Sequence, residues 1–364
     1  MRGKTVPQQS MMFAYSVEQF VPADHPIRAI KQFADAELAG LGKVFDRMYA
    51  STGRPSIPPE RLLKGALLMA LFSIRSERQL CEQLGYNFLY RWFLDMDVND
   101  APFDASTFSQ NRERLMKQEV GKLFFDRIVE AARKNQLLSS EHFTVDGTLI
   151  DANASLKSFK RKDAESNDKD DSGTPGSRNE QVDFHGEKRG NKTHQSTTDP
   201  ESRLMKKAAG KEAKLSFSAH VLMENRNGLC VDIRVAEANG KAEVAEAIAM
   251  LKRQTRRGVP IQTVGADKGY DNRTFVEPVR AAGVTAHVAA RVVGSAVDAR
   301  TTRHEGYKIS QRCRKKVEEI FGWMKVIGGL RRTRYRGKAR TDLYACIVAS
   351  AYNLVRMVKL LKPA

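Results

Sequence analysis

One helix is predicted for Arg312-Cys-Arg-Lys-Lys-Val-Glu-Glu-Ile-Phe-Gly-Trp-Met-Lys325, and the rest of the chain is interpreted around this stretch. Its apolar residues recur at three- and four-residue spacing, which gathers them on one face of a helix. At about 100° per residue, Arg314, Glu318 and Lys325 lie within roughly 40° of one another along one edge of that face, whereas Glu319 points toward solvent. The pattern therefore places one carboxylate at the edge of the core, with a cation one turn before it and another two turns after it.

An ordinary amphipathic surface helix shows the same pattern, because charges at i,i+4 stabilise a helix by about 0.2–0.5 kcal/mol per pair. Two other carboxylates favour a functional interpretation. Asp146 lies in the alternating run 143–149, which is typical of a strand, and Asp267 directly follows the apolar run 261–266. Taken alone, Asp267 is more often a turn or cap residue. Three carboxylates from separate elements, however, can hold two Mg²⁺ ions, an arrangement suited to in-line attack at phosphorus.

The composition indicates a polyanionic partner. The 364 residues contain 61 Lys and Arg against 43 Asp and Glu, a formal net charge of +18, which makes nucleic acid the leading partner class. No apolar run reaches the roughly 18 residues of a membrane span, and the first residues lack a signal-peptide core. The four cysteines form no CxxC pair and the histidines no HExxH, which argues against a zinc site and for a reducing cytoplasm.

The first part of the chain, residues 1–138, is predicted to be an all-helical domain. Within it, Ser106 is expected to cap a helix over 107–115, which carries Arg112 and Arg114 among other polar residues. Such a short polar helix is typical of a DNA-binding domain, so both arginines are predicted to contact DNA. A helical bundle with a solvated polar face fits this pattern equally well.

The second part, residues 139–364, is predicted to be an α/β domain with a mixed sheet flanked by helices. The expected elements are a strand at 142–149, a hairpin of 214–224 and 228–237, a helix at 242–256, a strand at 261–266, a helix at 274–282, a strand at 284–289, the quoted helix and a core helix at 341–361. Residues 157–203 are rich in Lys, Asp, Ser and Gly and nearly lack aliphatic residues. They are interpreted as a flexible insertion, disordered at least in part.

A dense basic loop follows the quoted helix, at Gly328-Gly-Leu-Arg-Arg-Thr-Arg-Tyr-Arg-Gly337. A solvated charge run is the simplest interpretation. Beside carboxylates that can bind metal, however, this loop suits a phosphate backbone. The arginines predicted to contact DNA here are Arg331, Arg332, Arg334 and Arg336.

Three motifs resemble those of the DDE transposases of bacterial insertion sequences, in the large group of insertion sequences four and five: Val145-Asp-Gly-Thr148, Ala266-Asp-Lys-Gly-Tyr270 and the run 310–325. The family signature is Tyr, two residues, Arg, three residues, Glu, six residues, Lys. Its last three positions are occupied by Arg314, Glu318 and Lys325. Gln311 stands at the Tyr position, and the nearest tyrosine is Tyr307. The resemblance covers nearly the whole chain.

This resemblance implies an RNase H-like catalytic core behind the helical domain, and DNA cleavage and strand transfer at transposon ends. It implies that Asp146, Asp267 and Glu318 bind two Mg²⁺ or Mn²⁺ ions, with Asp146 bridging both. Arg314 and Lys325 would hold phosphates near the scissile bond. The partners implied are double-stranded DNA, as terminal inverted repeats and as target, and a second copy of the chain in a homodimer assembled on DNA. The expected location is the cytoplasm, on the nucleoid, and no membrane is involved.

Three other functions compete with a transposase. A nuclease of the same RNase H-like fold would cut DNA without joining it, and a target-joining assay separates the two. A catalytically idle descendant would only bind DNA, although the presence of all three carboxylates disfavours it. A basic structural scaffold would require the spacing of the three motifs to arise by chance.

Overall fold

The protein is described here from a computed structural model, and the described residues are 16–49, 56–162, 183–184, 187–207, 210–240 and 242–361. The first part of the chain is all-helical, as predicted. After the short 3₁₀ helix η1 (Val17–Phe20) its helices are α1 (Ile27–Ala39), α2 (Gly42–Met48), α3 (Pro59–Leu71), α4 (Glu77–Gln83), α5 (Phe88–Phe93), α6 (Ala105–Lys117) and α7 (Val120–Lys134). The cap of α6 is Asp104 rather than Ser106, because the Asp104 carboxylate accepts a hydrogen bond from the Ser106 amide at 2.7 Å. Asp and Ser are equally good N-caps, so their order alone could not decide between them.

The second part is built on one mixed sheet. Its strands are β1 (His142–Asp151), β6 (Arg203–Lys206), β7 (Ala213–Glu224), β8 (Leu229–Glu237), β9 (Thr263–Ala266) and β10 (Thr285–Val288). The order is β10-β9-β1-β7, and β8 and β6 both pair with β7. The pairs β1–β9 and β9–β10 are parallel, whereas β7 runs antiparallel to β1 and β8. An antiparallel hairpin beside β1 and two parallel strands on its other side make the sheet RNase H-like, as predicted.

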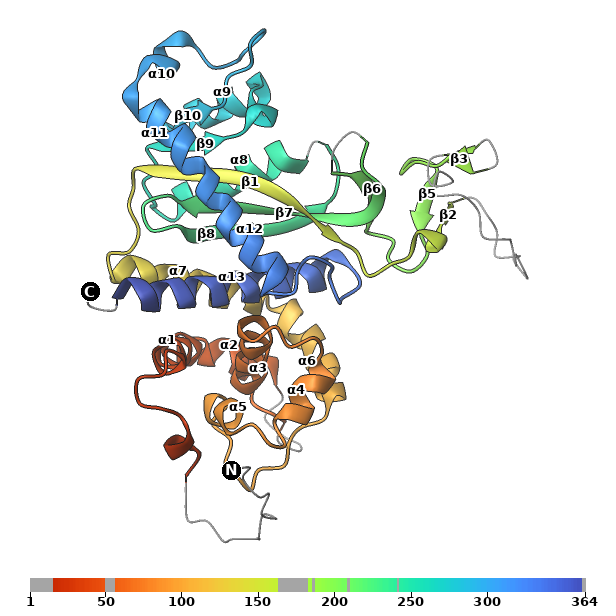
Figure 1. Cartoon of the computed structure of the whole chain (residues 1–364), viewed down its shortest axis with the longest axis vertical. Coiled ribbons are helices and arrows are strands. Elements are labelled where there is room, and N and C mark those ends of the chain that lie inside the picture. Colours follow the sequence, from red (N-terminus) through yellow and green to blue (C-terminus); the bar gives the residue numbers. More distant parts are fainter. Residues whose placement is uncertain are drawn as a thin grey trace, which may run out of the picture.

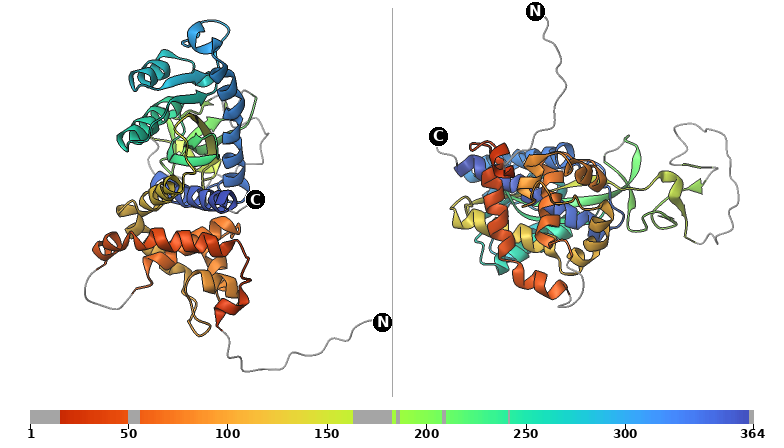
Figure 2. Two further views of the ribbon diagram at one scale, coloured as in Figure 1. Left: turned by 90° about the vertical axis from the view of Figure 1, so that its left-hand side faces the viewer. Right: turned by 90° about the horizontal axis from the view of Figure 1, so that it is seen from below.

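Helices cover both faces of this sheet (Figure 1). They are α8 (Ala242–Arg256), α9 (Arg273–Ala281), α10 (Ala299–Arg303), α11 (Glu305–Cys313), α12 (Val317–Val326) and α13 (Lys338–Leu361). Figure 2 shows α8 and α9 on one side of the sheet and α11 and α12 on the other. Below the sheet, α13 and α7 lie side by side and separate it from α1 to α6 (Figures 1 and 2).

The stretch from Arg312 to Lys325 is not one helix, contrary to the prediction. A 3₁₀ turn, η4 (Arg314–Lys316), separates the end of α11 from the start of α12. Tertiary contacts hold this turn, since Lys316 Nζ donates to the carbonyl of Asn225 at 2.9 Å. A periodic apolar pattern cannot report such a contact, because 3₁₀ and α-helical turns differ by only a fraction of a residue.

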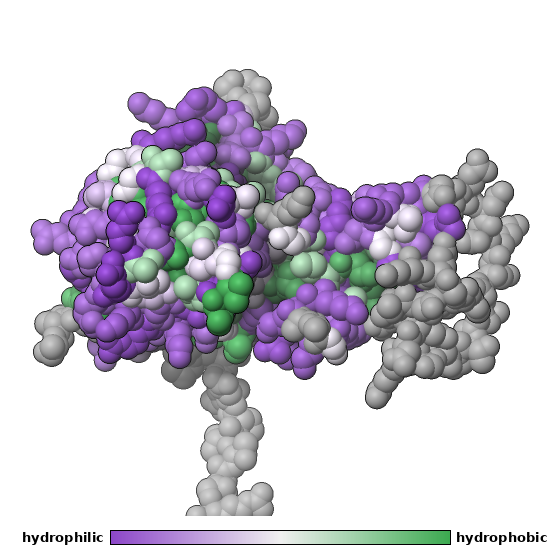
Figure 3. All heavy atoms as spheres, turned by 90° about the horizontal axis from the view of Figure 1, so that it is seen from above, coloured by the Kyte–Doolittle hydropathy of each residue, from purple (hydrophilic) through white to green (hydrophobic). Residues whose placement is uncertain are grey.

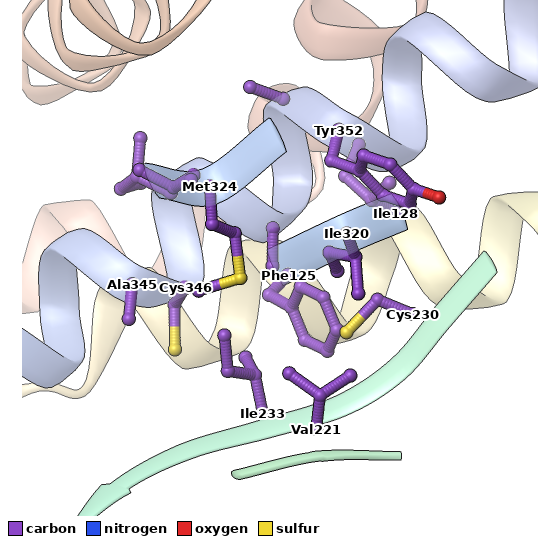
Figure 4. Packing of buried hydrophobic residues seen from close by; sticks show 14 of the residues in the cluster. Phe125, Ile128, Val221, Cys230, Ile233, Ile320, Met324, Ala345, Cys346 and Tyr352 are labelled. Carbon is purple, nitrogen blue, oxygen red and sulfur yellow. The ribbon is translucent and has the colours of Figure 1, made fainter. Parts of the chain in front are cut away.

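The apolar face predicted for this stretch is buried as expected, at Val317, Ile320, Phe321 and Met324. Figure 4 shows side chains of α12 meeting those of α7, α13, β7 and β8 in one core; the labelled residues are Phe125, Ile128, Val221, Cys230, Ile233, Ile320, Met324, Ala345, Cys346 and Tyr352. Helix α13 is long and apolar enough to cross a membrane, but 72% of its most apolar window is buried inside the protein. That burial identifies α13 as the core helix predicted for residues 341–361.

The insertion predicted at residues 157–203 has structured ends. The short elements there are η2 (Leu156–Ser158), β2 (Phe159–Arg161), β3 (Asp183–Phe184), β4 (Glu187–Lys188) and β5 (His194–Ser196). Strand β2 pairs with β5 and β3 with β4, and β6 begins at Arg203 and joins the main sheet. Residues 163–182 and 185–186 lie outside the described residues, so the prediction of disorder there stays a prediction.

Candidate functional site

Two of the predicted carboxylates meet where β1 and β9 lie side by side. In the parallel register, Thr144 lies opposite Gly265. Two residues further along each chain stand Asp146 and Asp267, on the same face of the sheet as that pair. The Asp146 carboxylate accepts a hydrogen bond from the amide of Gly147 at 2.7 Å. Asp146 thus lies within β1 and Asp267 directly after the neighbouring strand β9.

The Asp267 carboxylate lies at the start of the turn that follows β9. It accepts a hydrogen bond from the Gly269 amide at 2.8 Å and thereby caps η3 (Lys268–Tyr270). The cap function that the sequence also suggested for Asp267 is therefore real. One oxygen of the carboxylate is used in this cap, which fixes the side chain at the strand end while it remains exposed to solvent.

The electrostatics of this group show an excess of negative charge. Burial raises the pKa of Asp146 to about 6, the charges of Asp267 and Glu243 raise it as well, and the Gly147 amide and Arg314 act in the opposite direction. Burial and the charge of Asp267 likewise raise the pKa of Glu243. Carboxylates crowded in this way are stabilised by any cation that enters among them.

The donor set suits a hard divalent cation. Asp146 and Asp267 offer carboxylate oxygens, the ligands that Mg²⁺ and Mn²⁺ prefer. Behind them, the hydroxyl of Tyr270 is buried and has no hydrogen-bond partner among the described residues. No three His, Cys, Asp or Glu side chains of the described chain already lie close enough together to hold a metal ion. The arrangement fits the ion in charge and chemistry, and the carboxylates would have to draw together around it.

The third predicted carboxylate, Glu318, stands on the first turn of α12 and is exposed. The two cations that precede and follow Glu318 in the signature act on residues of β1. Arg314 is one of the charges that act on Asp146, and Lys325 Nζ donates to Thr148 Oγ1 at 2.5 Å. Thr148 shares its face of β1 with Asp146, so α12 lies over that face. The structure brings Arg314 and Lys325 to the site but leaves Glu318 outside the group of interacting carboxylates, so its role stays a prediction.

Two residues near the signature tyrosine position anchor α11 to the end of β10. The side-chain amide of Gln311 donates to the carbonyl of His287. The Tyr307 hydroxyl donates to the carbonyl of Val288 at 2.9 Å and accepts from the amide of Ala290 at 3.2 Å. Both side chains therefore fix the helix that leads into η4.

The basic loop divides into fixed and exposed arginines. Arg332 Nε donates to the carbonyl of Ala152 at 3.2 Å, and Arg334 donates to the carbonyl of Ile74 at 2.9 Å. Arg331, Arg332 and Arg336 are exposed, and Arg334 is half-buried. Arg332 and Arg334 already hold the loop in place through these hydrogen bonds, so Arg331 and Arg336 are the exposed arginines better placed to follow a polyanion. Contact of all four with DNA stays a prediction.

The two arginines of α6 differ in the same way. Arg112 forms an ion pair with Glu77 and lies 4.5 Å over the ring of Tyr335, from the basic loop. It therefore links the helical part of the chain to the loop beyond α12 instead of lying on an open face. Arg114 is exposed and lies 5.3 Å over the ring of Tyr49. Their contact with DNA also stays a prediction.

Sequence reasoning missed Glu243, on the first turn of α8. An acidic residue in the first turn of a helix is common, because it interacts favourably with the helix dipole. Nothing in its local sequence therefore distinguishes it. Only the packing of α8 on the sheet brings Glu243 close to Asp146 and Asp267.

Two sequence families match this chain. Residues 15–114 match the family described as "Transposase domain (DUF772)", and residues 140–354 match the "Transposase DDE domain". The second match spans more than half of the 364 residues. Among curated proteins, none matches the chain.

Several solved structures are similar at low identity. The piggyBac transposase synaptic complex with hairpin DNA is 8% identical, covers 93% of this chain and 73% of that chain, and has a TM-score of 0.40. A pre-cleavage Mos1 transpososome is 11% identical, with coverages of 86% and 81% and a TM-score of 0.20. A Mos1 mariner paired-end complex with Mn is 14% identical, with coverages of 94% and 88% and a TM-score of 0.21. The family assignment rests on the two sequence matches.

Proposed function

The chain belongs to the Transposase DDE domain family, and we propose that it is an active transposase which binds the ends of its element, cleaves DNA there and joins the cut end to a target. One observation carries this proposal. Asp146 on β1 and Asp267 directly after the neighbouring β9 have an excess of negative charge around them, and the segment η4–α12 brings Arg314 and Lys325 to this site. Carboxylates for a divalent cation and cations for phosphate are thus combined in one place.

In this proposal, Asp146 and Asp267 hold divalent cations, Mg²⁺ or Mn²⁺, and Glu318 completes the ligand set. Two such ions, when bound, lower the pKa of an attacking water or 3′-hydroxyl and stabilise the leaving oxygen. The protein's own residues position the DNA. Arg314 offers a planar fork for two phosphate oxygens, and Lys325 offers a point charge about three turns further along.

The hydroxyl of Thr148 sets where the Lys325 ammonium lies. The hydrogen bond between them holds the ammonium over β1, two residues beyond Asp146. Burial lowers the pKa of Lys325, and the charge of Lys207 acts in the same direction. An incoming phosphate would reverse both effects, because it replaces lost solvation and neutralises like charges. The site is therefore arranged to favour an anion at this point.

Several features support DNA as the partner. The net charge is +18, and the exposed Arg331 and Arg336 extend the basic surface beyond α12. Viewed from the end that carries α9, α10 and α11, the surface is mostly hydrophilic (Figure 3). We propose that the bound DNA is the element's terminal inverted repeats and then the target, that two copies of the chain assemble on it, and that they act in the cytoplasm on the nucleoid. The motif at residues 310–325 favours the group of insertion sequences four and five.

The alternative is a nuclease of the same fold that cuts without joining. The acidic group fits both activities, because cleavage and joining use the same attack at phosphorus. The alternatives are distinguished with DNA that carries the repeats flanking the gene, incubated with protein, Mg²⁺ and a supercoiled target plasmid. A transposase yields joined products, whereas a nuclease yields only cut ends. Absence of cutting at those repeats would contradict both.

The role of Glu318 is tested with its neighbour as a matched control. We expect Glu318→Ala to abolish cleavage while end binding persists, because a metal ligand acts on chemistry and affinity comes mainly from phosphate contacts. Glu319→Ala should keep most activity, since Glu319 instead pairs with Arg356 at 3.1 Å. Gel-based cleavage and binding assays on the same DNA measure both. If Glu318→Ala cleaves DNA at the wild-type rate, Glu318 is not a ligand of the site.

A further inference from the structure

We propose that Glu243 is a fourth carboxylate of the cation site, reaching it from α8 beneath β1, on the side opposite to α12. The inference rests on the proposed function, because it adds a ligand to the divalent-cation site formed by Asp146 and Asp267. It assigns a role to a residue that lies outside the three acidic motifs. The ligand class is a hydrated divalent cation such as Mg²⁺ or Mn²⁺.

Helix α8 approaches β1 at Gly147, the residue that follows Asp146. A Cβ placed on Gly147 would lie 3.5 Å from Cγ of Glu243 and 3.0 Å from Nδ1 of His220. His220 is the partner of Gly147 in the register between β1 and β7. Glu243 therefore packs beside the backbone that carries Asp146. A Cβ at this position would crowd His220, whereas its contact with Glu243 would be an ordinary one.

Two buried polar groups beside the carboxylates lack partners among the described residues. The hydroxyl of Tyr270 is unpaired in a residue that is 1% exposed, and Glu243, Asp146 and Asp267 all act on it electrostatically. His220 Nδ1 is also unpaired, in a residue that is 0% exposed, while its Nε2 lies 2.9 Å from Ser218 Oγ. Buried polar groups are nearly always paired, so unpaired ones at a functional site point to a missing water or ion.

The environment of Glu243 supports a ligand role over a helix-capping role. Although Glu243 is exposed, partial loss of solvation and the charge of Asp267 both raise its pKa. An acid that served only the helix dipole would be favoured by pointing away from other carboxylates. In the described part of the chain no ion pair involves Glu243, whereas Glu319 pairs with Arg356. A cation supplied from solution would offset the crowding of Glu243 with Asp146 and Asp267.

Metal binding by the full-length protein tests this inference without an activity assay. Calorimetric titration with Mn²⁺ is compared between the wild type, Glu243→Gln and Glu246→Gln, an acid-to-amide change on the same helix. We expect Glu243→Gln to weaken Mn²⁺ binding by roughly tenfold, the size seen when a supporting ligand is lost, and Glu246→Gln to change it less than about twofold. Glu243→Asp, which keeps the charge but shortens the reach, should fall between them. It replaces Glu243→Gln should that variant fail to fold.

Asp146→Asn in the same titration separates this inference from the proposed function. Loss of Mn²⁺ binding in Asp146→Asn together with wild-type binding in Glu243→Gln would overturn the role of Glu243 and leave the proposed function intact. Unchanged binding in both variants would overturn the metal site itself. Weakened binding in both, with Glu246→Gln unaffected, supports the fourth carboxylate.

Discussion

The two ends of helix α8 lie in opposite charge environments. Its first turn carries Glu243, whose charge acts on Asp146 and which is in turn affected by the charge of Asp267. Its last turn carries Arg253, whose Nε donates to Asp232 at 3.0 Å. One end therefore adds a negative charge to a group of acids, and the other adds a positive charge to a buried acid.

The buried acid is fully satisfied by the chain. Asp232 on β8 is 0% exposed and accepts hydrogen bonds from Lys122 Nζ at 2.9 Å and from the side-chain amide of Gln254 at 3.2 Å, besides the one from Arg253. Burial alone would raise its pKa, but the charges of Lys122 and Arg253 outweigh burial and hold the pKa below its ordinary value. Asp146 shows the reverse: Asp267 and Glu243 add to the effect of burial, and the opposing Gly147 amide and Arg314 do not outweigh it, so its pKa stays above the ordinary value.

This is the difference expected between a structural acid and an acid of the proposed cation site. At Asp232 the fold supplies the cations, so the charges hold α7, β8 and α8 together. At Asp146 two of the three charged neighbours are further carboxylates, so the proposed function has a neutralising cation come from solution. Acids whose pKa is perturbed in this way are typical of functional sites.

The largest effect is expected on catalysis, from the same substitution at both aspartates. Asp146→Asn should lower cleavage on the order of 10³-fold or more, because several kcal/mol of metal-assisted stabilisation are lost. Asp232→Asn should keep wild-type cleavage per folded molecule, since Asp232 lies outside the site. Single-turnover cleavage, normalised to the folded fraction from circular dichroism, measures both. Equal losses of cleavage in Asp146→Asn and Asp232→Asn would contradict the distinction between a catalytic and a structural acid.

The second effect is on stability, and here we expect Asp232→Asn, which leaves cleavage unchanged, to show the loss. Asp232→Asn should lower the free energy of unfolding by about 3 kcal/mol, because Lys122 and Arg253 lose their buried partner. Glu319→Ala, which removes an exposed ion pair with Arg356, should change it by less than about 1 kcal/mol. Urea unfolding followed by fluorescence provides the comparison. If Asp232→Asn lowers the free energy of unfolding no more than Glu319→Ala does, the buried network around Asp232 contributes little to stability.

A third, smaller effect concerns the pH dependence of stability without divalent cations. The pKa of Asp146 is about 6 in the folded protein, above its ordinary value of 3.8. The folded state therefore holds this proton more tightly, and stability falls as pH rises from about 4 to about 6. Asp146→Asn cannot titrate, so at pH 7.5 it should be more stable than the wild type by about 1 kcal/mol after allowance for solvent screening.

That advantage of Asp146→Asn should vanish below pH 4, where the wild-type carboxyl is protonated in both states. Added Mg²⁺ should reverse it at pH 7.5, because binding stabilises only the protein that keeps the ligand. Thermal melts in EDTA and in Mg²⁺ at the two pH values make the test. If the wild type is more stable than Asp146→Asn in EDTA at pH 7.5, the protein itself already neutralises the negative charge of Asp146.

The smallest effect is expected in the basic loop, between exposed and fixed arginines. Replacing Arg331 and Arg336 with Ala should reduce the slope of log affinity against log salt by about 2, since each phosphate contact contributes about 0.9. Arg334→Ala should leave the slope nearly unchanged and lower stability, because Arg334 bonds the carbonyl of Ile74 and lies over Tyr344. DNA binding at several salt concentrations distinguishes these outcomes. A flat salt dependence of the wild type would contradict the phosphate-backbone interpretation of the loop.

The sequence predicted those elements whose signals are local. The helix expected at residues 242–256 has the bounds of α8, and the helix expected at 274–282 corresponds to α9, whose N-cap Asn272 accepts from the Phe275 amide at 3.0 Å. The expected hairpin of 214–224 and 228–237 corresponds to β7 and β8, and its turn ends in Gly228, whose φ of +66° favours glycine. Capping residues and turn glycines act within a few positions of themselves, so a sequence displays them directly.

Elements that depend on distant partners were missed. Helices α10 and α11 lie partly in the polar stretch 294–305, and strand β6 begins within the predicted insertion and exists because it pairs with β7. The residues of the site also fall into those with a local sequence signal and those without one. Asp146 and Asp267 follow from two strand patterns, whereas the approach of Glu243 depends on packing that no local pattern encodes.

The most direct test of the account is to locate the metal. Crystals of the protein soaked in Mn²⁺ and measured near the manganese absorption edge give an anomalous difference map in which only the bound ions stand out. The account predicts the strongest peak between the carboxylates of Asp146 and Asp267, with no comparable peak at Asp232. A crystal in which Mn²⁺ binds elsewhere, and leaves Asp146 and Asp267 without a peak at saturating concentration, would contradict it.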